Sequence, residues 1–212
     1  MCSEREIGRE ELSIIQCYAH LGEVEALLPD WVSKVVHIGA GRSIVELLWS
    51  IERFDEVFLT DSDPTALSQI AGFSLENLSS IHISLDPPIQ PSKNPLSLED
   101  AIRLYKSFIA NFGVERRFRI RASKLHFLTL DALSPPPPIG GFHASFLFGY
   151  TAIIGLKSTE GGLFYLPECE VRQRARLLLE CVQLLLAPGG IALFSDLMPV
   201  RGVPEVILEV SG

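Results

Sequence analysis

Glycines and acidic residues follow apolar segments of the sequence, in positions where they could form a nucleotide-type binding site. Gly39 and Gly41 come directly after the apolar run at 34–38, in the stretch KVVHIGAGRSIVELLW. A strand that ends in Gly-x-Gly and passes into a helix offers a tight turn, room beside the backbone and free N–H groups. Asp61 ends the next apolar run, about 20 residues further on, where a carboxylate can accept hydrogen bonds from two ribose hydroxyls.

Two more acidic residues, Asp131 and Asp196, end later apolar runs. The carboxyl ends of parallel strands meet at one edge of a sheet, so we expect these groups to converge on one crevice. Each has an alternative role. Asp61 could cap the following helix, as could Asp63; Asp131 could open a turn before the prolines; and Asp196 could be a solvated loop carboxylate.

Strand and helix patterns alternate along the chain, which predicts an α/β fold: a Rossmann-like open parallel sheet with helices on both faces. We expect one domain over residues 1–212, with an N-terminal helix within 1–30 and an insertion at 74–122 between the second and third strands. A helix should begin at Pro64, because its missing N–H is no loss there. The other expected strands lie at 34–38, 56–61, 125–130, 142–148 and 191–195, and the other expected helices at 10–28, 43–52, 97–113 and 168–186.

Composition limits the function classes. With 47% hydrophobic and 21% charged residues the chain can bury a full core, and its net charge of −8 gives no general attraction to nucleic acid or anionic membranes. No apolar run approaches the roughly 18 residues of a membrane span, and the charged start MCSEREIGREEL is unlike a signal peptide. The four cysteines follow no metal or disulfide spacing, so we expect a cytoplasmic protein with reduced thiols and no metal site. The basic segment ERRFRIRA suits a solvated extended face better than a phosphate site.

The motifs GAGRSIVELL, FDEVFLTDSDP, FLTLDALSPPPP, FHASFLF and LLLAPGGIALFSD come in the order found in class I S-adenosylmethionine-dependent methyltransferases, which the chain resembles over residues 30–198. The G-x-G-x-[ST]-I and TD spacing and the insertion are most similar to the nicotinamide, phenylethanolamine and thioether N-methyltransferase family. This resemblance implies S-adenosylmethionine as the cofactor. It also implies methyl transfer to a small-molecule acceptor, with nitrogen as the acceptor atom.

Carried over one position at a time, the resemblance implies that Gly39, Ala40 and Gly41 pass under the methionine moiety and ribose of the cofactor. Asp61 would take the ribose hydroxyls, and Ser62 would lie beside the adenine.

The later motifs imply the rest of the site. Asp131 would accept a hydrogen bond from the adenine amino group, and the Ala132 backbone N–H would meet a ring nitrogen. Phe148 would line the cofactor pocket, although it could equally be core, and Asp196 would face the acceptor as the catalytic carboxylate.

The chain departs from the family pattern, and two of the departures bear on the fold and the site. His37 stands where most members have an acidic residue, and we expect it to be a hydrogen-bonded core histidine rather than a ligand or base. Residues 197–212 are too few for the usual sixth strand, helix and seventh strand. We therefore expect a C-terminally shortened sheet whose last strand, IALFS, is an exposed apolar edge open to aggregation, to a homodimer or to another partner.

Three functions compete on these observations. The first is small-molecule methyl transfer. The second is a catalytically weak or inactive cofactor-binding protein that works through dimerisation or a partner, which the short C-terminus favours. The third is an NAD-dependent oxidoreductase, which the missing third glycine and the LLLAPGG turn both disfavour.

Overall fold

The computed structural model describes residues 21–93, 95–110, 117–135, 138–159, 162–196 and 203. The expected strands and helices are confirmed where they fall within these ranges. Most of the N-terminal helix expected at 10–28 lies outside them. In chain order the elements are α2 (Leu21–Leu27), β1 (Lys34–Ile38), α3 (Ile44–Arg53), β2 (Glu56–Asp61), α4 (Pro64–Asn77), β3 (His82–Leu85), α5 (Leu98–Ala110), β4 (Lys124–Thr129), β5 (Phe142–Phe148), α6 (Tyr150–Gly155), β6 (Leu156–Thr159), β7 (Gly162–Tyr165), α7 (Glu168–Leu185) and β8 (Leu186–Ser195).

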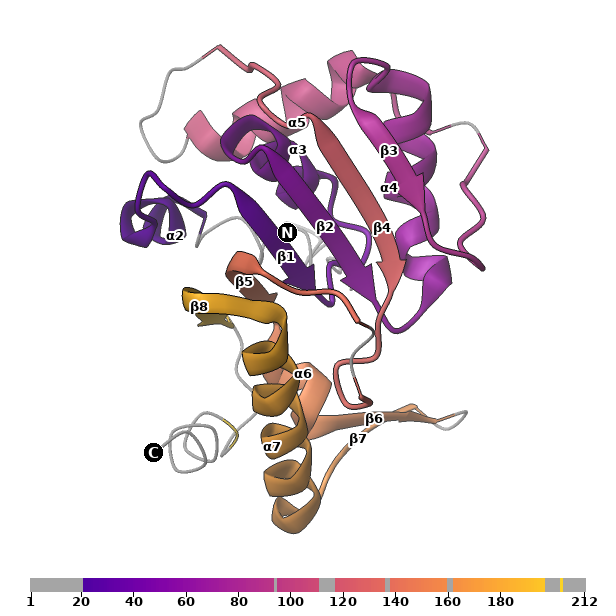
Figure 1. Ribbon diagram of the computed structural model, residues 1–212. Helices are drawn as coiled ribbons and strands as arrows, with labels where there is room; N and C mark the ends of the chain where they lie inside the picture. The colour runs from indigo at the N-terminus through magenta and orange to yellow at the C-terminus, as the bar shows by residue number, and fades with distance from the viewer. Residues whose placement is uncertain are drawn as a thin grey trace, which may run out of the picture.

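Six parallel strands form the main sheet, in the order β3-β4-β2-β1-β5-β8 (Figure 1). The chain passes from β1 through β2 to β3 at one end of the sheet and then inserts β4 between β2 and β3. It continues on the other side of β1 with β5 and β8. This reversal is the topological switch point of a doubly wound fold, where ligands bind outside the carboxyl ends of the strands. The predicted Rossmann-like α/β class is therefore confirmed.

Alternating side chains place the core on both faces of the sheet. Val35 packs with α3, α4 and α5 in one cluster, while its neighbour Val36 packs with α6 and α7 in the other. In Figure 1 the helices α3, α4 and α5 lie beside β1 to β4, and α6 and α7 lie next to β5 and β8. Helical spacing of the apolar residues in α7 predicts one buried stripe, and the structure confirms it: Val171, Ala175, Leu178, Val182 and Leu185 are buried.

Local signals set the helix starts. The Ser43 side chain caps α3 by accepting a hydrogen bond from the Glu46 N–H at 3.3 Å. Pro64 opens α4 as expected, and Asp63 caps it through the Thr65 N–H. The Ser97 hydroxyl caps α5 by accepting a hydrogen bond from the Asp100 N–H at 3.2 Å.

Three features differ from the expected elements. The segment predicted as an insertion, 74–122, begins inside α4 and contains β3, which forms one end of the main sheet. Beyond β5 the chain adds α6 and an antiparallel hairpin of β6 and β7, a separate two-stranded sheet that the sequence pattern did not predict. The strand expected at 191–195 starts earlier, because Leu186 already pairs with Phe142 and the Pro-Gly-Gly turn bulges out within β8.

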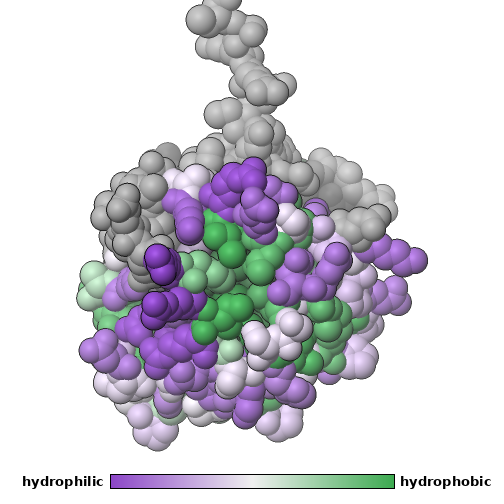
Figure 2. Space-filling view, turned by 90° about the horizontal axis from the view of Figure 1, so that it is seen from above, coloured by the Kyte–Doolittle hydropathy of each residue, from purple (hydrophilic) through white to green (hydrophobic). Residues whose placement is uncertain are grey.

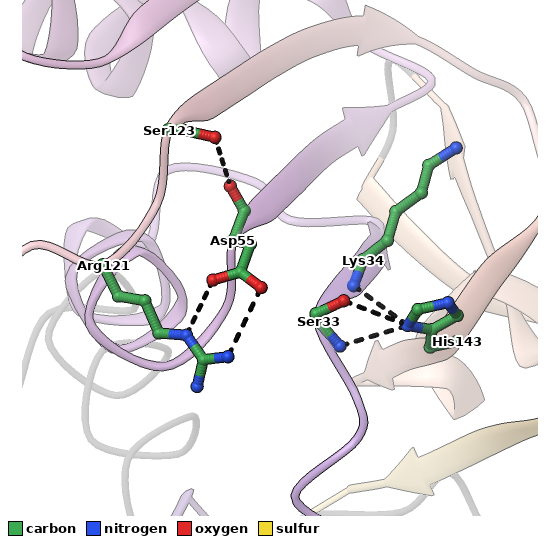
Figure 3. A network of polar contacts seen from close by, with 6 residues as sticks. All are labelled: Ser33, Lys34, Asp55, Arg121, Ser123 and His143. Atoms are coloured by element: carbon green, nitrogen blue, oxygen red, sulfur yellow. Dashed lines mark hydrogen bonds and ion pairs between the residues drawn. The ribbon is translucent and has the colours of Figure 1, made fainter.

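A polar network fastens the amino ends of the strands (Figure 3). The carboxylate of Asp55 accepts from Arg121 at 2.7 Å and 3.3 Å, and its carbonyl accepts from the Ser123 N–H and hydroxyl. The His143 Nδ1 atom accepts from the Ser33 N–H at 3.2 Å, so the neutral ring carries its proton on Nε2. In the described part of the arginine-rich segment, residues 117–121 have no regular secondary structure, and Arg117, Arg119 and Arg121 are exposed as expected.

The Asp55–Arg121 pair should contribute modestly to stability. Both side chains are about half exposed, at 51% and 41%, and such pairs are worth about 0.2–1 kcal/mol. We expect Arg121→Ala to lower the free energy of unfolding by about 1 kcal/mol, measured by urea denaturation. Arg119→Ala, an exposed arginine of the same segment, is the control; an equal loss in both variants would contradict a specific role for the pair.

A second polar chain crosses three strands of the sheet. The His126 Nε2 atom lies 3.1 Å from the Glu56 carboxylate, its Nδ1 atom lies 2.5 Å from the Ser84 hydroxyl, and its ring stacks on Phe58. Burial lowers the pKa of His126 below its ordinary value of 6.5, and the opposing attraction of Glu56 is smaller.

This shift predicts a pH dependence of stability. The unfolded chain takes up a proton at His126 near pH 6.5, while the folded chain takes it up only at lower pH. The contribution of the neutral His126 ring to the free energy of unfolding is therefore complete above pH 6.5. It is lost as the pH falls from 6.5 towards the pKa of His126 in the folded chain. Urea denaturation of wild type and His126→Gln between pH 7.5 and 5 should show a shallower decline in the variant, and parallel curves would contradict the assignment.

Apolar side chains also reach the surface. Figure 2 shows hydrophobic residues gathered in the middle of one face, among polar neighbours. Across the described chain the most exposed large apolar residues are Tyr165, Leu27, Leu184 and Trp31. None of the described helices is both long enough and apolar enough to cross a membrane.

Candidate functional site

All the residues predicted for the site lie at one edge of the main sheet. Gly39 follows β1, Asp61 ends β2 and Asp131 follows β4. Phe148 ends β5, and Asp196 follows β8. Since the six strands are parallel, these positions share the carboxyl edge, at the switch point between β1 and β5.

The glycine loop after β1 needs its glycines. Gly39 and Gly41 have positive φ angles of 72° and 57°, a region that side chains disfavour. A Cβ atom on Gly39 would meet the Ile153 side chain of α6 at 3.1 Å, whereas one on Gly41 would meet nothing within 4 Å. Between them, Ala40 is buried and donates its N–H to the Thr60 carbonyl at 2.8 Å. The loop is thus bound to β2 and leaves open space beside Gly41.

The Asp61 carboxylate lies against this loop. One oxygen accepts from the Gly41 N–H at 3.0 Å and the other from the Asp63 N–H at 2.9 Å. Burial raises the pKa of Asp61 above its ordinary value of 3.8, although these hydrogen bonds pull it down. An ionised carboxylate offers about four acceptor positions, so further donors can approach both oxygens. Asp63 caps α4, the role that was the alternative for Asp61. Ser62, between the two acids, is exposed.

The Asp131 carboxylate is engaged in its own turn. It accepts from the Leu133 N–H at 2.9 Å and from the Ser134 hydroxyl at 2.8 Å. This is the alternative role that the following prolines suggested, and it uses one acceptor position on each oxygen. Ala132 is buried in the cluster formed with α6 and α7. The contact of both residues with an adenine stays a prediction.

The last two predicted residues have protein partners. Phe148 is half-buried, with its ring 5.9 Å from the centre of the His37 ring, so it contacts the core. One oxygen of Asp196 accepts from the Thr151 N–H at 3.2 Å and from the Thr151 hydroxyl, at the start of α6. Asp196 therefore fixes α6 against the end of β8, which a solvated loop carboxylate would not do.

His37 is a core histidine, as expected. Its side chain is 1% exposed, and its Nε2 atom lies 2.8 Å from the Ser50 hydroxyl. The sequence interpretation missed the Glu46 carboxylate, which is also buried and lies 3.4 Å from the His37 Nδ1 atom. The Ser43-x-x-Glu46 spacing, typical of a capping box, could have drawn attention to it. It also missed Thr151 and Ile153 of α6, for which the sequence gives no signal.

Comparison with known proteins gives similarity to solved structures only. No protein-family model matches the chain, and no curated protein matches it. A TehB-like SAM-dependent methyltransferase from Corynebacterium glutamicum has 14% identity and a TM-score of 0.41, over 88% of this chain and 68% of that one. A putative methyltransferase from Pseudomonas syringae has 16% identity and a TM-score of 0.38, over 89% and 81%.

A SAM-dependent methyltransferase from Thiobacillus denitrificans, solved with S-adenosyl-L-homocysteine, has 15% identity and a TM-score of 0.35. The overlap covers 84% of this chain and 46% of that one, so this chain spans about half of its length. The class of the fold rests on the strand order itself.

Proposed function

We propose that this chain binds S-adenosylmethionine at the carboxyl edge of its sheet and transfers the methyl group to the nitrogen of a small-molecule acceptor. The observation that carries the proposal is the 3.0 Å hydrogen bond from the Gly41 N–H to the Asp61 carboxylate. It joins a glycine loop with open space beside it to a half-buried acid at the carboxyl edge of the sheet. Nitrogen as the acceptor atom follows the family resemblance of the motifs.

The residues at this edge fit an adenosyl ligand. Gly41 leaves room where a side chain would fill the space, and Asp61 keeps acceptor positions for two ribose hydroxyls. Burial, which raises the pKa of Asp61, also leaves its carboxylate poorly solvated by water. Hydrogen bonds from ribose hydroxyls to this carboxylate would therefore be stronger than the same bonds in water. Gly39, Ala40, Ser62, Asp131, Ala132 and Phe148 complete the proposed cofactor contacts.

The cofactor supplies an already activated methyl group, so the protein's contribution is alignment and exclusion of water. Alignment can account for about 7–11 kcal/mol of a barrier in favourable cases. Asp196 is the carboxylate that we propose contacts the acceptor substrate. Its hydrogen bonds with Thr151 hold it at the start of α6. There it would orient an amine and stabilise the positive charge that the acceptor nitrogen gains.

Calorimetric titration with S-adenosylmethionine, S-adenosylhomocysteine and NAD tests the proposal. We expect binding of the first two and none of NAD; binding of NAD alone would replace the proposal with an oxidoreductase. A methyl-transfer assay over amines, pyridines and thioethers then tests catalysis. Binding without formation of S-adenosylhomocysteine would favour the inactive cofactor-binding alternative, and turnover of thioethers alone would contradict a nitrogen acceptor.

We also propose that β8 pairs with a second copy and that the protein works in the cytosol. Within the described chain β8 is the last strand at its end of the sheet, and its apolar residues Ile191, Leu193 and Phe194 are only partly buried. Light scattering tests this pairing of β8: a dimer that Leu193→Lys dissociates would support it, and a monomer at all concentrations would contradict it.

The proposed location in the cytosol agrees with the thiols of the described chain. Cys169 and Cys181 are free, as the reducing cytosol favours.

A further inference from the structure

A histidine and a glutamate form a buried polar pair beneath the glycine loop. The His37 side chain is 1% exposed and that of Glu46 is 4% exposed. Apart from Glu46, the described groups facing the ring are Ser50 and the aromatic side chains of Trp49, Phe146 and Phe148.

Such a pair is costly to keep in an apolar core. Burying a carboxylate is unfavourable unless it is well paired, and replacing a buried ion pair by apolar residues is often neutral or stabilising. The contact from the His37 Nδ1 atom to the Glu46 carboxylate is 3.4 Å, long beside the usual 2.7–2.9 Å of a charge-assisted hydrogen bond. Within the described residues the Nδ1 atom has no hydrogen bond at all. The pair is therefore poorly explained as a device for stability.

The position of the pair relates it to the loop. His37 is two residues before Gly39, and its carbonyl accepts from the Thr60 hydroxyl at 2.7 Å, beside Asp61. Glu46 is in the first turn of α3, immediately beyond the loop, with its N–H bound to Ser43. The contact between the two side chains thus joins the strand that enters the loop to the helix that leaves it.

We propose that Glu46, acting through His37, is a positioning residue that holds residues 39–41 in their ligand-binding conformation. The proposal rests on the proposed function of the loop as a cofactor site. The Glu46 carboxylate lies 3.4 Å from the Nδ1 atom of the imidazole and so orients the ring, while Nε2 faces the Ser50 hydroxyl. The long contact leaves scope for the pair to tighten when a ligand occupies the loop.

Two substitutions separate positioning from simple packing. Glu46→Leu fills the space without charge, and Glu46→Gln keeps the shape and one oxygen acceptor. Ser74→Ala, which removes a buried polar group from a different helix, α4, is the control. We expect Glu46→Leu to keep the urea unfolding midpoint of wild type or exceed it, while S-adenosylhomocysteine binds at least tenfold more weakly by calorimetry. Glu46→Gln should recover about a third of the wild-type affinity.

A readout without ligand makes the two proposals distinguishable. Amide hydrogen exchange at residues 39–41 should be at least tenfold faster in Glu46→Leu than in wild type or Ser74→Ala. If wild type binds no S-adenosylhomocysteine, the proposed function fails, while this exchange result still supports or overturns the positioning role. Unchanged loop exchange in Glu46→Leu, or a loss of affinity only in proportion to a loss of stability, would overturn it.

Discussion

Asp61→Asn is expected to weaken the binding of S-adenosylmethionine about 100-fold. The Gly41 and Asp63 N–H groups donate to different oxygens of this carboxylate. An amide has one oxygen, so its NH₂ group must face one of these donors, and the charge that strengthens bonds to the ribose is lost. Hydrogen bonds to a charged group are worth about 1.5–3 kcal/mol each, and about 3 kcal/mol in all corresponds to 100-fold.

The fold should survive this substitution. The pKa of Asp61 is raised in the folded chain, so between 3.8 and that pKa the folded form holds a proton that the unfolded form has lost. The ionised carboxylate consequently lowers stability as the pH rises through that window, and its charge is no stabilising feature at neutral pH. Asp63→Asn is the control, since asparagine caps a helix about as well as aspartate. Calorimetry in which Asp61→Asn binds within threefold of wild type would remove Asp61 from the site.

Phe146→Ala is expected to lower the free energy of unfolding by about 3–5 kcal/mol. Phe146 is fully buried on β5, and its ring contacts the rings of His37, Trp49, Phe54 and Phe148. Its removal leaves a cavity between the sheet and α3 that these rigid rings fill poorly. Because whole domains are stable by only about 5–15 kcal/mol, the variant should unfold at a much lower urea concentration.

The control for Phe146→Ala is Phe164→Ala, on the β6–β7 hairpin. Phe164 is 52% exposed, so the same change there should alter the free energy of unfolding by less than about 0.5 kcal/mol. Equal effects of the two substitutions in urea denaturation would contradict the assignment of Phe146 to the centre of the core.

Periodicity in the sequence was enough to predict the central sheet. Each of these elements has a clear apolar pattern that fits one type of secondary structure with its apolar residues buried: β1, β2, β4, β5 and α7. The short strand β3 was missed because HISL is half-exposed and mixes polar with apolar residues. Its pairing with β4 depends on residues about 40 positions away, and such tertiary contacts override local preference.

The site was predictable in position but not in its contacts. Apolar runs that end in glycine or aspartate place Gly41, Asp61 and Asp131 at one edge once the strands are known to be parallel. The partner of Asp196 is Thr151, 45 positions earlier, on a helix that the pattern did not predict. Side-chain partners depend on tertiary packing, so the sequence pattern predicted His37 as a core residue but did not predict its partner Glu46.

The most direct test of the account asks whether one adenosyl ligand covers all three strand ends. Amide hydrogen exchange of the full chain, with and without saturating S-adenosylhomocysteine, resolves residues 39–41, 61–63 and 131–133 separately. We expect slower exchange in all three segments on binding, with little change at the amino ends of the strands around Ser33 and Asp55. Protection confined to a different part of the molecule, or absent from the glycine loop and Asp61 despite binding, would contradict it.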